Sequence, residues 1–86
     1  MFEVYLSQKA EKFLEKLDKE MCSRIKDRLR KLGENPVPSD SKFITREQGE
    51  KIFRCRIGDY RALYKVKDQE KIVLVAKIDK RPRAYA

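Results

Sequence analysis

Arginine is the residue type in this chain that is best suited to chemistry. Arg54 and Arg56 alternate with apolar residues in one segment, and Arg61 follows a Gly58-Asp59 turn signal. A guanidinium stays protonated, donates paired hydrogen bonds to a phosphate and stacks on bases. Because the chain has no histidine, His-based nucleophiles, bases and proton shuttles are excluded, and we expect no metal site and no cofactor. The arginines therefore predict stabilisation of phosphate charge.

The charge is concentrated in the second half of the chain. The 86 residues carry a formal charge of +8, and residues 42–86, with thirteen Lys/Arg and six Asp/Glu, account for +7 of it. Such a balance predicts a polyanionic partner. No run approaches the roughly 20 apolar residues of a membrane span, and no signal peptide is recognisable, so we expect a cytoplasmic protein that does not enter membranes. The length predicts one domain, residues 1–86.

The spacing of hydrophobic residues predicts the helices and strands that position these cations. Residues 2–6 alternate as in a strand, and a helical stripe then runs over residues 8–32. One straight helix would be nearly 40 Å long, too long for so small a domain, so we expect a helical hairpin that breaks near Asp18 and ends at Gly33. Period-2 patterns return at residues 52–57, 60–66 and 72–78. The order β-α-α-β-β-β predicts an α+β fold, with a helical hairpin on one face of a small, mainly antiparallel four-stranded sheet.

Strand alternation gathers the basic residues on one face of that sheet. The apolar partners of Arg54 and Arg56 must cover the core, and the same reasoning applied to the next strand places Arg61 and Lys65 beside them. Lys77 joins from the last strand, and Arg81, Arg83 and Tyr85 lie at its exit. We expect no acid at a strand-interior position of this face. An ordinary solvated sheet face is the alternative, but adjacent like charges repel and favour a phosphate-bearing ligand.

The first half of the chain has a different charge pattern. Acids and bases stand at helical spacing in the pairs Glu15–Lys19, Glu20–Arg24 and Asp27–Lys31, which is typical of a solvated helix face. Cys22 and Cys55 fall on predicted core faces, and two cysteines are too few for a disulfide framework. We therefore expect both thiols to be reduced and to pack as small hydrophobic side chains.

Two segments resemble a known family. The stretch from Phe53 to Tyr64, with the pattern R-x-R-x-G-D-Y-R-x-x-Y, and the closing Lys80-Arg81-Pro82-Arg83-Ala84-Tyr85 are similar to RelE-type toxins of the RelE/ParE toxin–antitoxin superfamily. The resemblance covers nearly the whole chain and includes the order of elements. It implies a ribosome-dependent endoribonuclease that cleaves mRNA in the ribosomal A site and inhibits translation. It also implies a cognate RelB-type antitoxin that wraps around the toxin, in a complex that binds its own promoter DNA.

The resemblance also assigns roles to residues. The family carries basic residues on the second and third strands, an arginine after the fourth and a C-terminal tyrosine. The positions that match as catalytic are Arg54, Arg56, Arg61, Arg81 and Tyr85. Further cations that we expect to bind RNA are Lys51, Lys65, Lys77, Lys80 and Arg83. In the reaction the RNA 2′-OH attacks the adjacent phosphate, the arginines stabilise the developing charge, and the tyrosine stacks on a base.

The general base is not identified by the sequence. Some relatives have a lysine on the second strand or a histidine near the fourth-strand exit, whereas this chain has arginines and Lys80. The open candidates are Lys77, Lys80, the Tyr85 phenolate, a ribosomal group or no base at all. Two other functions also stay open. One is inhibition of DNA gyrase in the manner of ParE, and the other is RNA binding without catalysis.

Overall fold

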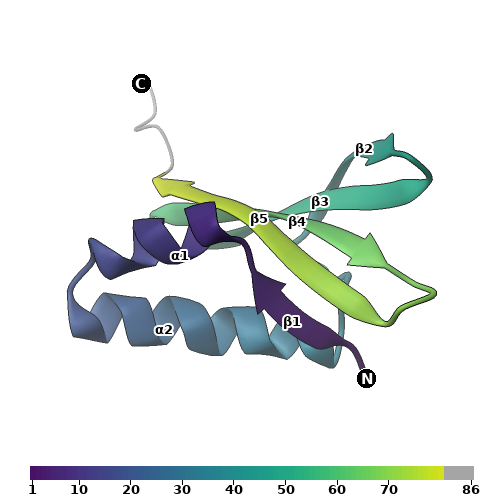
Figure 1. Ribbon diagram of the computed structural model, residues 1–86. Coiled ribbons are helices and arrows are strands. Elements are labelled where there is room, and N and C mark those ends of the chain that lie inside the picture. Colours follow the sequence, from purple (N-terminus) through teal and green to yellow (C-terminus); the bar gives the residue numbers. More distant parts are fainter. Residues whose placement is uncertain (81–86) are drawn as a thin grey trace.

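Two helices pack against one face of a five-stranded sheet (Figure 1). The computed structural model describes residues 1–80, so the expectations for Arg81, Arg83 and Tyr85 lie outside the described residues. No helix within residues 1–80 is long and apolar enough to cross a membrane. The elements are β1 (Glu3–Leu6), α1 (Gln8–Glu15), α2 (Lys19–Arg30), the 3-10 turn η1 (Lys31–Gly33), β2 (Lys42–Glu47), β3 (Glu50–Ile57), β4 (Tyr60–Lys67) and β5 (Ile72–Lys80).

The sheet has the order β1-β5-β4-β3-β2, in which β1 runs parallel to β5 and the other pairs are antiparallel. The predicted α+β class is confirmed, but the predicted number of four strands is wrong because β2 forms a fifth at the edge. All six residues of β2 are exposed. An edge strand with no buried face leaves no alternation of apolar and polar residues, and this is why the sequence pattern did not reveal it.

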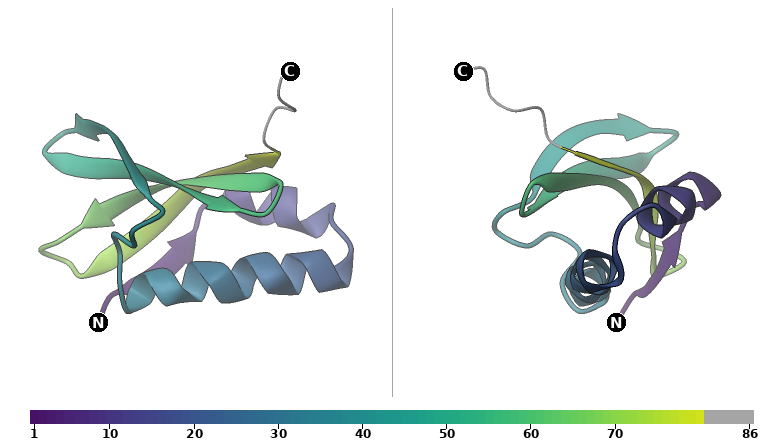
Figure 2. Two further views of the ribbon diagram at one scale, coloured as in Figure 1. Left: turned by 180° about the vertical axis from the view of Figure 1, so that it is seen from behind. Right: turned by 90° about the vertical axis from the view of Figure 1, so that its left-hand side faces the viewer.

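The helical hairpin forms where the sequence predicted it. The Asp18 carboxylate accepts a hydrogen bond from the Met21 backbone N–H at 2.8 Å and begins α2. Gly33 is buried at the end of η1, where an added Cβ would lie 2.7 Å from the Phe2 carbonyl oxygen. The glycine is therefore required by this close approach to β1. Both helices lie on the same side of the sheet (Figure 2), which leaves the other side uncovered.

A bulge in β5 decides which side chains reach that uncovered side. Val75 pairs with Tyr64, but Lys77 pairs with the preceding residue Leu63, so Ala76 is an extra residue in the strand. Val75 is fully buried, and strict alternation after it would turn Lys77 toward the core. The extra residue reverses the alternation, so that Ile78 is buried and Lys77 is exposed.

Ser7 connects this bulge to the start of α1. Its Oγ accepts a hydrogen bond from the Ala10 N–H at 3.0 Å and donates one to the Ala76 carbonyl oxygen at 2.7 Å. Its own backbone N–H donates to the Val75 carbonyl oxygen at 2.9 Å. One hydroxyl therefore caps the helix and satisfies the carbonyl that the bulge removes from the regular ladder.

We expect Ser7→Ala to lower the free energy of unfolding by about 2 kcal/mol. The helix cap contributes about 1 kcal/mol, and the hydrogen bond to the bulge carbonyl contributes a similar amount. Urea denaturation measures the change, with Ser23→Ala as the control, because Ser23 is exposed on α2 and should stay within about 0.5 kcal/mol. A Ser7→Ala protein as stable as the control would show that the hydroxyl does not support the bulge.

The segment between η1 and β2 is held against the helix side of the sheet. The Tyr64 hydroxyl donates to the Pro36 carbonyl oxygen at 2.7 Å, and the Arg28 guanidinium donates to the Asp40 carboxylate at 2.6 Å. That hydrogen bond lowers the pKa of Asp40. Cys55 lies in the core as predicted, and burial raises the pKa of its thiol to about 11. The thiol is therefore protonated and chemically inert at neutral pH.

Candidate nucleic-acid interface

The uncovered face of the sheet presents basic side chains in two neighbouring rows. The β3–β4 and β4–β5 registers align Arg56, Arg61 and Asp79 in one row. The next row runs from Lys42 on β2 through Arg54 and Leu63 to Lys77 on β5. Neighbouring strands are about 4.8 Å apart, so side chains from four strands converge on one surface. We call this surface the open face.

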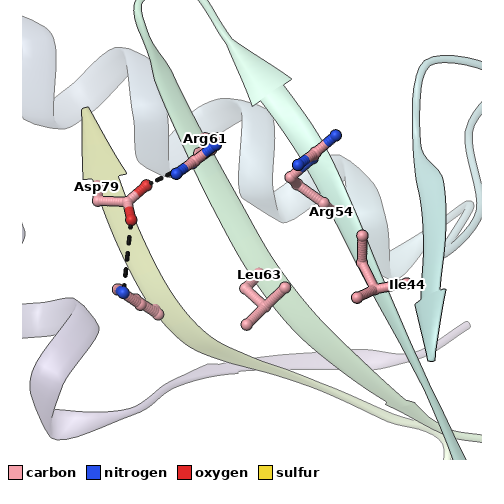
Figure 3. A pocket seen from close by; sticks show the side chains of 6 residues that line it. Ile44, Arg54, Arg61, Leu63 and Asp79 are labelled. Carbon is pink, nitrogen blue, oxygen red and sulfur yellow. Dashed lines mark hydrogen bonds and ion pairs between the residues drawn. The ribbon is translucent and has the colours of Figure 1, made fainter. Parts of the chain in front are cut away.

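A depression of about 220 Å³ lies at the centre of the open face. It is lined by two apolar residues, three cations and one acid, namely Ile44, Leu63, Arg54, Arg61, Lys77 and Asp79. Figure 3 shows Arg61 on β4 reaching across to Asp79 on β5, while Arg54 comes from β3 on the opposite side of β4. A concave apolar floor with cations around it can seat a sugar or base and hold its phosphate at the rim.

The Asp79 carboxylate forms ion pairs with two of these cations, Arg61 and Lys77. Arg61 Nε donates to Asp79 Oδ1 at 2.9 Å, and Lys77 Nζ lies 3.6 Å from Asp79 Oδ2. The Arg61 and Asp79 side chains are 35% and 32% exposed, which is open enough for a ligand to reach them. Because the carboxylate engages Nε, the terminal amino groups of Arg61 stay available to a phosphate.

The expectation that no acid occupies a strand-interior position of this face is therefore wrong, because Asp79 lies within β5. Besides Asp79, two glutamates at the far end of the face lie near Lys65, with Glu47 Oε1 at 3.8 Å and Glu50 Oε1 at 3.6 Å from its Nζ. The acids were overlooked because they lie at strand ends in the sequence, whereas pairing brings them beside the cations. Lys65 lies on the open face as predicted, but acids surround it.

Arg54 and Arg56 are uncompensated cations of the open face. Neither forms an ion pair with any acid among residues 1–80. Arg56 lies directly opposite Arg61 in the register, which places two like charges on adjacent strands. Such an arrangement destabilises the free protein and is relieved when an anion binds between them.

Two of the predicted RNA-binding lysines lie elsewhere. Lys51 pairs with Val66, and Lys80 pairs with Tyr60, so both belong to the helix side of the sheet. They do not share the face of Arg54, because each is an odd number of residues from the outward positions of its strand. Sequence reasoning did not place Lys42, Ile44 and Asp79 on the open face. Their positions depend on the edge strand β2 and on the bulge in β5, which no sequence pattern revealed.

Comparison with known proteins places the chain in a family. Residues 4–85 match the family model described as ParE toxin of type II toxin–antitoxin system, parDE. The chain is also 31% identical over 85 residues to a protein of Methanocaldococcus jannaschii that bears the name toxin RelE1, covering 98% of this chain and 94% of that protein. Both matches span almost the whole chain, including the strands that form the open face.

Solved structures give the same result. The archaeal RelE–RelB complex from Pyrococcus horikoshii OT3 contains a chain that is 28% identical, with a TM-score of 0.86, over 96% of this chain and 98% of that one. The RelBE2 complex from Mycobacterium tuberculosis contains one that is 26% identical, with a TM-score of 0.78, over 93% and 91%. The isolated RelE toxin of Escherichia coli, at 23% identity and a TM-score of 0.74, shares the fold. The chain therefore belongs to the ParE toxin family of type II toxin–antitoxin systems, and it is a RelE-type toxin.

Proposed function

We propose that this toxin is a ribosome-dependent endoribonuclease that cleaves mRNA in the A site and so inhibits translation in the cytoplasm. The observation that carries the proposal is the open face, where Arg54, Arg61 and Lys77 surround a depression with an apolar floor. Cations on rigid strands are preorganised to stabilise charge that develops on a phosphate. The resemblance to RelE-type toxins supplies the reaction.

In the proposed reaction the RNA 2′-OH attacks the adjacent phosphorus, a new P–O bond forms, and the bond to the 5′-oxygen of the next nucleotide breaks. The products carry a 2′,3′-cyclic phosphate and a 5′-hydroxyl, so the reaction consumes no water in this step. Arg61 binds the non-bridging oxygens through its terminal amino groups, and Arg54 and Arg56 hold the flanking backbone. Arg81 and Tyr85 keep the roles that the resemblance assigns, charge stabilisation and base stacking.

The positions of Lys77 and Lys80 disfavour both lysines as the general base. Lys80 lies on the helix side of the sheet, and Lys77 forms an ion pair with Asp79, so we assign Lys77 a charge-stabilising role. Arginine is unsuited to be a general base, because a guanidinium keeps its proton in proteins. We therefore propose that the base is the Tyr85 phenolate or a group of the ribosome, and that the protein contributes mainly electrostatic stabilisation and orientation.

We propose a RelB-type antitoxin as the protein partner. The Pyrococcus horikoshii and Mycobacterium tuberculosis chains that resemble this one at 28% and 26% identity were both solved in complexes with such proteins. The uncompensated Arg54 and Arg56 favour an antitoxin with acidic side chains in the covering segment. From the resemblance to the RelE/ParE superfamily, we also propose that the complex binds its own promoter DNA.

The test uses the purified toxin and ribosomes programmed with an mRNA that places one codon in the A site. The proposal predicts mRNA cut at that codon, with fragments that end in a 2′,3′-cyclic phosphate, and no cleavage when ribosomes are left out. Addition of the cognate antitoxin should abolish cleavage. Intact mRNA at a saturating dose of the wild-type toxin would refute the proposal.

Inhibition of DNA gyrase is the second candidate function, because the matching family model is described as a ParE toxin. Gyrase inhibition needs no nuclease chemistry. This function predicts that the toxin blocks supercoiling of plasmid DNA by gyrase. A supercoiling assay beside the ribosome assay separates the two functions. Unimpaired supercoiling together with A-site cleavage would support the nuclease. The reverse result would support gyrase inhibition, and RNA binding with neither activity would leave only a binding module.

A further inference from the structure

A second basic hollow lies outside the open face. It is a groove of about 420 Å³ between α2 and the end of the β3–β4 hairpin. Met21, Ile57 and Gly58 form part of its wall, together with the acid Asp27, and its cations are Arg24, Arg28, Lys31 and Arg56. Three of those four are exposed residues, so their charged groups are accessible to a ligand in the groove.

The charges of this groove are not balanced within the protein. Helical spacing had paired Arg24 with Glu20 and Lys31 with Asp27, but neither ion pair forms among residues 1–80. Asp27 instead pairs with Arg30. Arg28 is compensated by Asp40 at 2.6 Å. Three cations of the groove, Arg24, Lys31 and Arg56, are therefore left without an acidic partner in the described part of the chain.

The groove and the open face are linked by shared lining residues. Arg54 lines both the central depression and a neighbouring hollow beside Lys42, whose lining also includes Asp40, the partner of Arg28. Arg56 lines that hollow and also the groove on α2. The connection exists because β2 pairs with β3 only as far as Arg54. Beyond that point the edge of β3 is uncovered, so Arg56 can contribute to hollows on either side of the sheet edge.

We propose that the α2 groove binds the phosphodiester backbone of RNA and extends the interface from the open face around the edge of β3. The proposal rests on the proposed function for the class of ligand, and it adds Arg24 and Lys31, which line the groove beside Arg56 and lie outside the open face. Spaced, unpaired cations along a continuous groove are the usual arrangement for tracking a nucleic-acid backbone without reading its sequence. Met21 and Ile57 offer apolar contact to a sugar or base.

The test compares the variant Arg24→Ala/Lys31→Ala with the control Lys9→Ala/Lys12→Ala. The control removes the same charge from exposed positions on α1 that do not line the groove. Binding is measured as a function of salt with a trinucleotide, with a single-stranded RNA of about twelve nucleotides and with 30S ribosomal subunits. Loss of two phosphate contacts should reduce the slope of log K against log salt by about 1.4. Circular dichroism establishes that both variants are folded.

One outcome is that the groove variant shows a reduced slope with the longer RNA and an unchanged slope with the trinucleotide. That result supports the proposal and indicates that one RNA strand spans the open face and the groove. A reduced slope only with the 30S subunits supports it with ribosomal RNA in the groove. Equal behaviour of the groove and control variants on every ligand overturns it. The proposed nuclease function is tested separately by A-site cleavage, so either proposal can fail while the other stands.

Discussion

Replacing Arg61 with alanine should lower the rate constant of mRNA cleavage on the ribosome by about 10²-fold. The Arg61 guanidinium is fixed by its Nε hydrogen bond to Asp79 at 2.9 Å, so its terminal amino groups are oriented before the substrate binds. Preorganised donors of this kind contribute on the order of 3 kcal/mol to transition-state stabilisation. Single-turnover cleavage of A-site mRNA at saturating toxin isolates this step from binding.

Two further variants separate charge from geometry. Arg61→Lys keeps the charge but loses the planar fork, and it should restore only part of the lost rate. Asp79→Asn keeps Arg61 and Lys77 and removes the carboxylate that positions Arg61. It should slow cleavage while RNA binding becomes tighter, because one negative charge has left the face. Full activity in Arg61→Ala would show that the reacting phosphate does not lie in the central depression.

Replacing Tyr64 with alanine should lower the free energy of unfolding by about 3–5 kcal/mol. Tyr64 is fully buried, stacks on Phe53 with ring centroids 5.8 Å apart, and donates its hydroxyl hydrogen to the Pro36 carbonyl oxygen. Truncation leaves a cavity in the core and frees the segment that leads into β2. A domain of this size has a total stability of about 4–13 kcal/mol, so a large fraction would be lost.

Tyr64→Phe isolates the hydrogen bond, and it should cost about 1 kcal/mol because the ring stays in place. Tyr5→Phe is the matched control: Tyr5 is 50% exposed, and its hydroxyl donates to the nearby carboxylate of Glu3. It should change stability by less than about 0.5 kcal/mol. Urea denaturation monitored by circular dichroism measures all three variants. A Tyr64→Ala protein within about 1 kcal/mol of the wild type would contradict the assignment of Tyr64 to the core.

The amino-acid sequence by itself determined the elements with a buried face and the order in which they occur. The helix starts were recognisable from Ser7 and Asp18, because each caps the residues that immediately follow it. Alternation around Arg54 and Arg61 was sufficient to predict that they share one face, since a strand with one buried side directs the other side outward. These are local consequences of hydrophobic burial and of backbone hydrogen bonding.

Only the tertiary structure decided which charges meet. Asp79 reaches Arg61 because β5 pairs with β4 and because the bulge at Ala76 reverses the side-chain alternation of β5. The Asp79 side chain therefore lies on the open face. Strand β2 has no buried residues of its own, so it forms at the edge of the sheet because it pairs with β3. Arg24 and Lys31 seemed paired along the helix, yet their neighbours in space leave them free to face Arg56 across the groove. Side-chain pairing depends on register and strand neighbours, and neither is encoded in the spacing of residues along one strand or helix.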